Sequence, residues 1–329
     1  MSYDAAHRLR GIKDQGAGSS LAQIEYLGPA RERSRTHSNG TRATFGYDAV
    51  GQITASTLST TATPSAVLDR RTFAWDRASN KREQVDTRVG PPRKRTHAYD
   101  SLYRMSGSKR FNGTVLQEEI AYDMDSPGNR TSVTGGFGAG SYTLTGSHAL
   151  VHEYTTTPAD SRSYDGNGNL LEKQGQATIK YNYLNQMIEY RDIALAKRHV
   201  YKHDPFGRRI EKIVDADGSE PKVTRYFFDP WYRLCEEQDG EGVTLATYVH
   251  GNGIDDVLAM RRDVDASGGP EDYFYHGDDQ GNVLALVNAA GSVVERREYA
   301  DYGKPLNSSF QPAGASAFGN PFLFNGKTF

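Results

Sequence analysis

Histidines and carboxylates at short spacings are the first candidates for chemistry in this sequence. His148 and His152 lie four residues apart with Glu153 beside them, and a second histidine pair, at 199 and 203, repeats that spacing. A zincin helix needs glutamate directly after the first histidine, and that position is alanine here. On a strand, side chains four residues apart are more than about 13 Å apart, too far for one ion. We therefore predict no metal site and expect no cofactor.

Acidic residues occur in two loop-like runs and two adjacent pairs. The runs at 165–169 and 215–218 resemble the start of a calcium loop, but neither has the glutamate that such a loop needs at its twelfth position. The pairs Asp255-Asp256 and Asp278-Asp279 would point to opposite faces of a strand, which makes them poor acid–base partners. We expect Asp278 or Asp279 to cap a turn before Gly281.

Nucleophile motifs are missing. No Gly-x-Ser-x-Gly or phosphate-binding glycine loop occurs. The single cysteine, Cys235, is followed by two glutamates that would raise its pKa, so we interpret it as a packed residue. We expect no catalytic residue in this chain.

The elements that would position any site are set by a repeat: an aromatic residue, Asp, two further residues, then Gly, Asn or Tyr, then Arg, Asn or Gln, and then Leu, Ile or Met. We expect the last two positions to begin the next strand. An aromatic residue at a strand end would cover the sheet and keep its hydroxyl in water. Asp would cap the turn, and Gly or Asn would supply the positive φ of a tight turn. The repeat-turn residues that we select are Tyr3, Asp4, Tyr47, Asp48, Tyr99, Asp100, Tyr122, Asp123, Tyr164, Asp165, Asp204 and Asp229. Residues between the motifs alternate with period 2, which is typical of strands.

The remaining stretches fit the same pattern less well. Residues 184–195 can be interpreted as a helix or as a turn plus a strand. The Thr-rich segment Ser56–Pro64 indicates a loop or a weak edge strand. The sequence divides into repeats at 1–134, further repeats at 141–270 that continue the first set, and a different C-terminal segment at 271–329. The fold class is all-β, built from tandem β-hairpins.

Composition and charge limit the function classes. Gly and Tyr are frequent, at 34 and 20 of 329 residues, which suits a thin wall of hairpins with partly wet faces. Residues 1–110 carry +9 and the rest −11. Contact with nucleic acid is one interpretation of the basic part; we favour attraction between the two parts or to a neighbour, because the basic residues are dispersed. The longest apolar run is five residues, far short of a membrane span.

The repeats together with the C-terminal segment resemble the YD-repeat, or Rhs (rearrangement hotspot), family. The segment has Tyr-His-x-Asp-x-x-Gly from 275, Tyr-x-Asp-x-Gly from 299 and Asn-Pro-x-x-Phe-x-Gly from 320. Its core-like residues are Tyr275, His276, Asp278, Gly281, Tyr299, Asp301, Gly303, Asn320, Pro321, Phe324 and Gly326. The resemblance extends from Tyr3 to Gly326.

The resemblance implies a curved spiral of hairpins, part of a large shell or a small open barrel. In polymorphic toxins and in insecticidal Tc toxins such shells hold a C-terminal toxin, and the resemblance implies a bacterial protein that is secreted, surface-associated or delivered as part of a larger effector. The family continues into a self-cleaving segment that lies beyond Phe329, so we expect a truncated core. With about 22 strands the chain covers roughly 3,200 Å², between a quarter and a third of a shell around a toxin of about 200 residues.

Three functions follow from the motifs and the resemblance. The first is a non-enzymatic shell segment whose partners are the rest of the shell or an enclosed toxin. The second is a module for adhesion, binding a glycan or a surface protein through exposed aromatic rings, among which Trp231 is the candidate ligand residue. The weakest is a self-cleaving protein that processes a toxin. Unpaired sheet edges also predict homo-oligomers.

Overall fold

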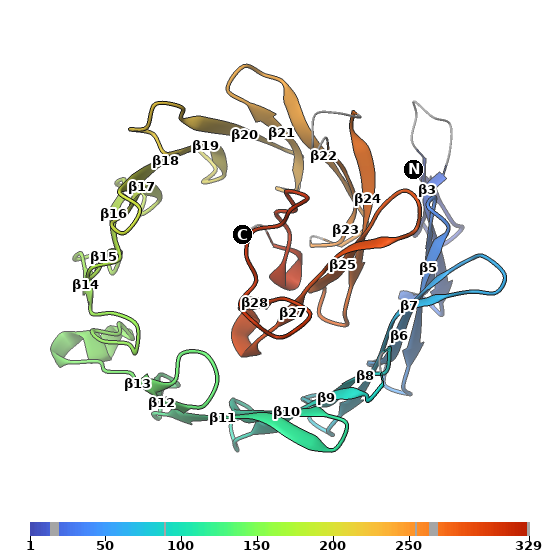
Figure 1. Cartoon of the computed structure of the whole chain (residues 1–329), viewed down its shortest axis with the longest axis horizontal. Coiled ribbons are helices and arrows are strands. Elements are labelled where there is room, and N and C mark those ends of the chain that lie inside the picture. Colours follow the sequence, from blue (N-terminus) through green and yellow to red (C-terminus); the bar gives the residue numbers. More distant parts are fainter. Residues whose placement is uncertain (14–19, 89, 254, 263–268, 328–329) are drawn as a thin grey trace. The chain divides into compact units, whose positions relative to one another are not determined.

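The computed structural model describes residues 1–13, 20–88, 90–253, 255–262 and 269–327, and the end of the chain at Phe329 lies outside them. Two thirteen-stranded antiparallel sheets follow the chain in strict order, β1 to β13 and β14 to β26, and neither order returns to its first strand (Figure 1). A two-stranded sheet, β27–β28, follows. The predicted all-β fold of tandem hairpins is confirmed.

The first sheet consists of β1 (Ser2–Tyr3), β2 (Leu9–Lys13), β3 (Ser20–Leu27), β4 (Arg31–His37), β5 (Thr41–Tyr47), β6 (Ile53–Thr60), β7 (Val67–Trp75), β8 (Lys81–Asp86), β9 (Arg93–Tyr99), β10 (Met105–Asn112), β11 (Val115–Met124), β12 (Arg130–Thr134) and β13 (Gly140–Ser141). A 3₁₀ turn, η1 (Gly146–Val151), follows it.

The second sheet consists of β14 (Arg162–Tyr164), β15 (Leu170–Lys173), β16 (Ala177–Tyr181), β17 (Met187–Asp192), β18 (Lys197–His203), β19 (Arg209–Val214), β20 (Lys222–Phe228), β21 (Leu234–Asp239), β22 (Thr244–His250), β23 (Val257–Arg262), β24 (Glu271–Gly277), β25 (Val283–Val287) and β26 (Val293–Arg296). The C-terminal part holds β27 (Glu298–Tyr299), η2 (Asp301–Gly303), β28 (Pro305–Leu306) and η3 (Phe324–Gly326).

The chain forms two compact units, which are described separately. Unit 1 contains residues 1–98, 108–117 and 246–329; unit 2 contains residues 99–107 and 118–245. Segments 184–195 and Ser56–Pro64 contain strands rather than a helix and a loop: β17 lies within the first, and β6 pairs on both sides with β5 and β7. The expectation of a loop or edge strand at Ser56–Pro64 was therefore wrong for residues 56–60, which belong to β6, and right for residues 61–64, which lie outside any strand. Ser56 and Leu58 are fully buried on one face of β6.

Unit 1 has a layered core. Ile24, Ala43 and Leu58 of the N-terminal strands pack against Phe274 and Val287, and β24 and β25 lie beside β5 and β7 in Figure 1. The other face of β25 carries Leu284, which packs on Tyr299 and Leu323 of the C-terminal part. All five residues of β25 are buried, since both faces of the strand are covered. This unit is thicker than the thin wall that the composition predicts.

Unit 2 is closer to that thin wall. Its strands β17 to β20 contain no fully buried side chain, and most of their residues are half-buried. Its one cluster of several buried apolar residues, among those described, joins Ile120, Tyr122 and Val133. A sheet with two partly wet faces is what the composition predicts.

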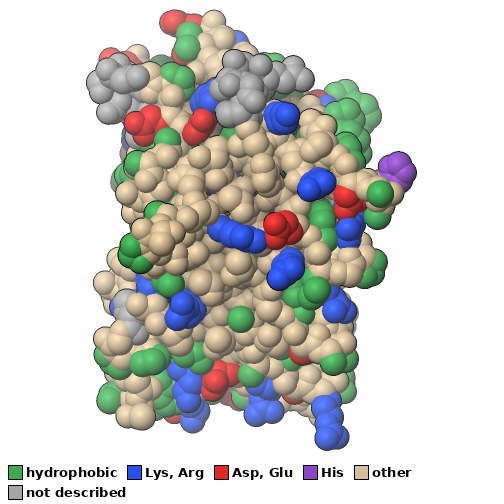
Figure 2. All heavy atoms as spheres, turned by 90° about the vertical axis from the view of Figure 1, so that its right-hand side faces the viewer, with side chains coloured by type: hydrophobic (Ala, Val, Ile, Leu, Met, Phe, Trp, Pro, Cys, Tyr) green, Lys and Arg blue, Asp and Glu red, His purple; other side chains and the backbone are tan. Residues whose placement is uncertain are grey.

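Charged side chains are spread over the outer face of unit 1 that strands β3 to β7 form. Figure 2 shows Lys and Arg there lying apart among uncharged surface, with Asp and Glu between some of them, rather than as one basic stripe. No helix in the described residues is long and apolar enough to cross a membrane.

Candidate functional site

Each repeat turn is a five-residue loop organised by its first residue. In the turn after β5, Asp48 Oδ1 accepts hydrogen bonds from the backbone N–H groups of Val50, Gly51 and Gln52 at 3.0, 2.8 and 2.9 Å. The backbone N–H of Asp48 donates to the carbonyl of Gln52, and that of Gly51 to the carbonyl of Asp48. The fourth residue has a positive φ, which is +96° at Gly51. The carboxylate therefore satisfies donors that the tight turn would leave unpaired.

The fifth residue of the turn takes part as well. The repeat motif has Arg, Asn or Gln at this position, but we expected it only to begin the next strand. Arg8, Arg104, Arg208 and Arg233 each return a guanidinium to the aspartate four residues earlier, at 2.6 to 2.7 Å. In other turns an asparagine does the same through its amide, as Asn169 does to Asp165 at 2.8 Å. The spacing Asp-x-x-x-Arg or Asp-x-x-x-Asn was the available signal.

The selected repeat-turn residues occupy this arrangement except for the pair Tyr122 and Asp123. Those whose side chains accept both the second and the fourth following backbone N–H are Asp4, Asp48, Asp100, Asp165, Asp204 and Asp229. The placement of Asp123 was wrong: it pairs within β11, and its carboxylate accepts a hydrogen bond from Ser132. Asp125 organises that turn instead, because the strand continues two residues further and Tyr122 is buried within it.

The aromatic residues at strand ends connect neighbouring hairpins. Tyr47 donates its hydroxyl to the carbonyl of Glu32 at 2.7 Å, and Trp75 donates its indole N–H to that of Ile53 at 2.8 Å. Tyr164 likewise reaches the carbonyl of Tyr154. The expectation of wet hydroxyls was wrong for the two tyrosines, because each side chain is long enough to cross to a neighbouring segment. Tyr3, by contrast, is exposed.

The core-like motifs come together although they are far apart in the chain. Tyr275 donates its hydroxyl to Asn320 Oδ1 at 2.9 Å, and the same oxygen accepts the N–H of Phe322, one residue after Pro321. Gly303 has φ +89°, and a Cβ there would lie 2.6 Å from the ring of Phe324.

The remaining core-like residues complete the same part of unit 1. Tyr299 donates to the carbonyl of Val283, Asp278 organises the turn that contains Gly281, and Asp301 accepts a hydrogen bond from Ser108. A Cβ at Gly326 would collide with the carbonyl oxygen of Asp255. These contacts hold the C-terminal residues on β25.

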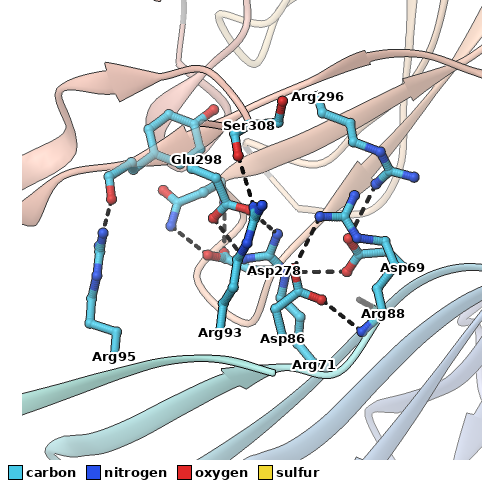
Figure 3. Close-up of polar contacts among 12 residues, drawn as sticks. Asp69, Arg71, Asp86, Arg88, Arg93, Arg95, Asp278, Arg296, Glu298 and Ser308 are labelled. Carbon is cyan, nitrogen blue, oxygen red and sulfur yellow. Dashed lines mark hydrogen bonds and ion pairs between the residues drawn. The ribbon is translucent and has the colours of Figure 1, made fainter. Parts of the chain in front are cut away.

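A buried polar network joins β7 and β8 to the C-terminal strands; Figure 3 shows most of it, and we call it the lock. Arg71 binds Asp69 Oδ1 at 3.2 Å and both carboxylate oxygens of Glu298 at 3.1 and 2.8 Å. Arg296 contacts Asp69 at 3.4 Å and donates to the carbonyl of Leu68. His276 Nε2 lies 3.7 Å from Asp69. The lock consists of Asp69, Arg71, Lys81, Asp86, Arg88, His276, Asp279, Arg296 and Glu298.

Two flanking contacts extend the lock along β9. Arg93 donates to the carbonyl of Ser308 at 2.8 Å, and Arg95 donates to that of Tyr299 at 2.5 Å (Figure 3). Lys81, the first residue of β8, binds Oδ1 of Asp279, which lies in the turn between β24 and β25, at 2.7 Å. Basic side chains of the N-terminal strands thus bind acceptors of the C-terminal segment, which gives the positive charge of the first third a structural role.

The lock controls the ionisation of its own carboxyls. Burial alone would raise the pKa of Asp69, but the charge of Arg71 and the hydrogen bond that Arg71 donates hold that pKa well below its ordinary value. Asp279 shows the opposite result: burial and the neighbouring Asp278 raise its pKa to about 6 in spite of Lys81.

Two histidines of unit 1 outside the lock are also affected by burial, which lowers the pKa of His37 to about 3 and that of His97 to about 4.

A cavity of about 320 Å³ lies beside the lock in unit 1. Arg35, Asp255, Asp256, Tyr275 and Asp278 are among the residues that line it. Arg35 is already bound to Asp256 at 2.8 and 3.1 Å, and Asp278 is occupied by its turn. Arg35, Asp256 and Asp278 are therefore already engaged by partners within the protein.

The other candidate residues lie apart. His148 binds Glu153 at 2.6 Å and His152 binds Asn129 at 2.9 Å. Among the described residues no three His, Cys, Asp or Glu side chains are grouped as metal ligands. Burial raises the pKa of the Cys235 thiol, which leaves it a poor nucleophile. Trp231 is exposed at a turn tip, with the guanidinium of Arg233 5.3 Å from its ring centre.

Comparison with known proteins supplies the context for this geometry. The chain superimposes on the crystal structure of TcdB2-TccC3 with a TM-score of 0.75 at 15% identity, over 99% of its own length and 18% of that chain. A second structure, TcdB2-TccC3-TEV, gives 0.73 at 14% identity. The chain has the YD-repeat, or Rhs-type, fold. The resemblance inferred from the aromatic–Asp motifs is thereby confirmed.

Curated proteins give a second, independent similarity. The chain is 26% identical over 212 residues to the tRNA nuclease WapA of Bacillus subtilis (strain 168) and to the tRNA3(Ser)-specific nuclease WapA of Bacillus spizizenii. The match covers 64% of this YD-repeat chain and 8% of each relative. No family model matches the sequence.

Proposed function

We propose that this chain is a non-enzymatic wall segment of a YD-repeat shell that encloses a toxin. The observation that carries the proposal is the superposition of 99% of the chain on TcdB2-TccC3. The chain spans 18% of that structure and 8% of WapA, so the shell and its cargo belong to a longer protein. The wall itself is supplied by the tandem hairpins, and the rest of the shell and the toxin are its partners.

The lock gives this segment a specific task in such a wall. It fastens the C-terminal strands, to which a cargo would be attached, onto N-terminal hairpins more than two hundred residues earlier. Buried ion pairs of this kind specify one register, because any shift leaves a charge unpaired. The segment would therefore fix the register in which the C-terminal strands lie on the N-terminal hairpins of unit 1.

Limited proteolysis of the longer protein that contains this segment tests the proposal. We expect the toxin part to resist protease in the intact protein and to be digested when Glu298→Lys opens the lock. Arg191→Glu, at an exposed ion pair on unit 2, is the control and should leave protection intact. Digestion of the toxin part at the same rate in the intact protein and in isolation would overturn the proposal.

A glycan-binding or adhesion role is the second candidate, and the exposed ring of Trp231 favours it. A glycan array with the wild type and Trp231→Ala tests it: a signal that disappears in the variant supports the role, and no signal excludes it.

Self-cleavage is the weakest candidate. An unchanged intact mass after long incubation of the purified chain would count against it.

A further inference from the structure

Three consecutive turns of unit 2 share one rim of the second sheet. They are residues 182–186, 204–208 and 229–233, and they join β16 to β17, β18 to β19 and β20 to β21. These six strands are hydrogen-bonded neighbours in sequence order. Successive turns are therefore two strands, or about 10 Å, apart along the same edge. We call these three turns the aromatic rim.

The aromatic rim carries exposed apolar side chains at equivalent positions. Leu184, Phe206 and Trp231 each donate their backbone N–H to the first residue of their turn at 2.9 Å. Because the turns have the same conformation, these three side chains leave the sheet at corresponding places. Tyr183 and Tyr232 lie beside them, and the exposed fractions are 90% for Tyr183, 71% for Phe206 and 69% for Trp231.

The charges of the aromatic rim are neutralised within it. Asp204 binds Arg208 at 2.6 Å, and Asp229 binds Arg233 at 2.7 Å. The guanidinium of Arg208 also lies 5.2 Å from the ring centre of Tyr232, which joins one turn to the next. The rim therefore presents rings without a surplus charge that would repel an identical surface.

Unit 1 contains an example of one set of turns resting on another. Asn39, in the turn between β4 and β5, donates its side-chain amide to the carbonyl of Asn288, in the turn between β25 and β26, at 2.9 Å. A Cβ at Gly291 would lie 3.1 Å from the carbonyl oxygen of Asn39. A five-residue turn of the repeat type, residues 288–292, thus packs closely against a hairpin turn from a distant run of strands.

We propose that the aromatic rim is the contact surface of a two-fold symmetric dimer with a second copy of this chain. A two-fold axis through Phe206 would bring Tyr183 and Leu184 of one copy against Trp231 and Tyr232 of the other, since the turns are evenly spaced. Such an interface is self-complementary. The exposed rings offer roughly 600 Å² per copy, close to the about 800 Å² per partner of a standard interface. This surface is distinct from the unpaired sheet edges, and the dimer does not require a cargo.

Sedimentation velocity of the purified chain over a concentration series tests the proposal. We expect a dimer whose dissociation constant rises at least about tenfold in Phe206→Ser/Trp231→Ser. Val50→Ser is the matched control, because Val50 is 77% exposed at the same turn position in unit 1; it should dimerise as the wild type does. A monomer at every concentration, or a dimer that the double variant does not weaken, would overturn the proposal.

Tryptophan fluorescence adds a readout at the interface itself. The chain has two tryptophans, so Trp75→Phe leaves Trp231 as the single reporter. Its emission should shift to shorter wavelength as the dimer forms and the ring leaves water. If the shift instead appears only on addition of phosphatidylcholine vesicles or of a soluble β-linked glucan, with no change in mass of the protein species, the second copy is the wrong occupant.

Discussion

The guanidinium of Arg71 on β7 binds both carboxylate oxygens of Glu298 on β27, and both side chains are almost completely buried. A buried ion pair contributes little net stability, but the loss of one partner leaves an unpaired charge in a low dielectric. The pair therefore acts chiefly on register: it fixes which N-terminal strand the C-terminal segment lies on.

Glu298→Gln should lower the unfolding free energy of unit 1 by about 3 kcal/mol, because Arg71 loses a charged partner. Urea denaturation with hydrogen exchange at β7 and β25 measures the loss and assigns it to unit 1. Asp69→Asn/Arg71→Met/Glu298→Leu removes the three charges that Arg71 joins and should recover a large part of it. A single variant as stable as the wild type would show that the pair does not hold the C-terminal segment in place.

Asp229→Ala should lower the stability of the hairpin β20–β21 by about 1–2 kcal/mol, since the side chain accepts two backbone N–H groups and binds Arg233. Asp229→Asn keeps the acceptor for the backbone but loses the charge, so it should cost about half as much. Urea midpoints of the two variants provide the comparison. Equal losses would assign the effect to the ion pair rather than to the cap.

The difference between these two predictions shows what the sequence could reveal. The turn that Asp229 organises is complete within five residues, so its fold is visible in local spacing. The lock is not visible in local spacing. Asp69 and Arg71 lie on the same buried face of β7 as Phe73, but in the sequence two charged residues indicate positions that face solvent. They are buried only because Glu298, far away in the chain, pairs with Arg71. Ser56 misleads for the same reason: a small polar residue is buried on β6 by packing that comes from residues elsewhere in the chain.

Acid should destabilise unit 1 through its buried histidines. His37, 5.2 Å from the ring centre of Phe274, has a pKa of about 3, and His97, which faces Asp301, Arg95 and Lys81, has a pKa of about 4. Both values lie below the ordinary histidine value of 6.5, so the unfolded chain binds protons first and stability falls as the pH drops from about 6.5 toward 4. Urea midpoints across this range measure the slope, and His37→Gln/His97→Gln should flatten it. A slope that persists in the double variant would assign it to other groups.

Asp279 should act in the opposite sense. Its pKa of about 6 lies above the ordinary value of 3.8, so the folded chain holds the proton more tightly and stability falls as the pH rises from about 4 to 6. Asp279→Asn removes this contribution, and the variant should gain about 2–3 kcal/mol relative to the wild type between pH 4 and pH 7. The comparison uses the change in unfolding free energy between the two pH values, so a constant cost of altering the contact with Lys81 cancels. A difference between variant and wild type that is the same at both pH values would mean that Asp279 is already ionised at pH 4, held so by Lys81.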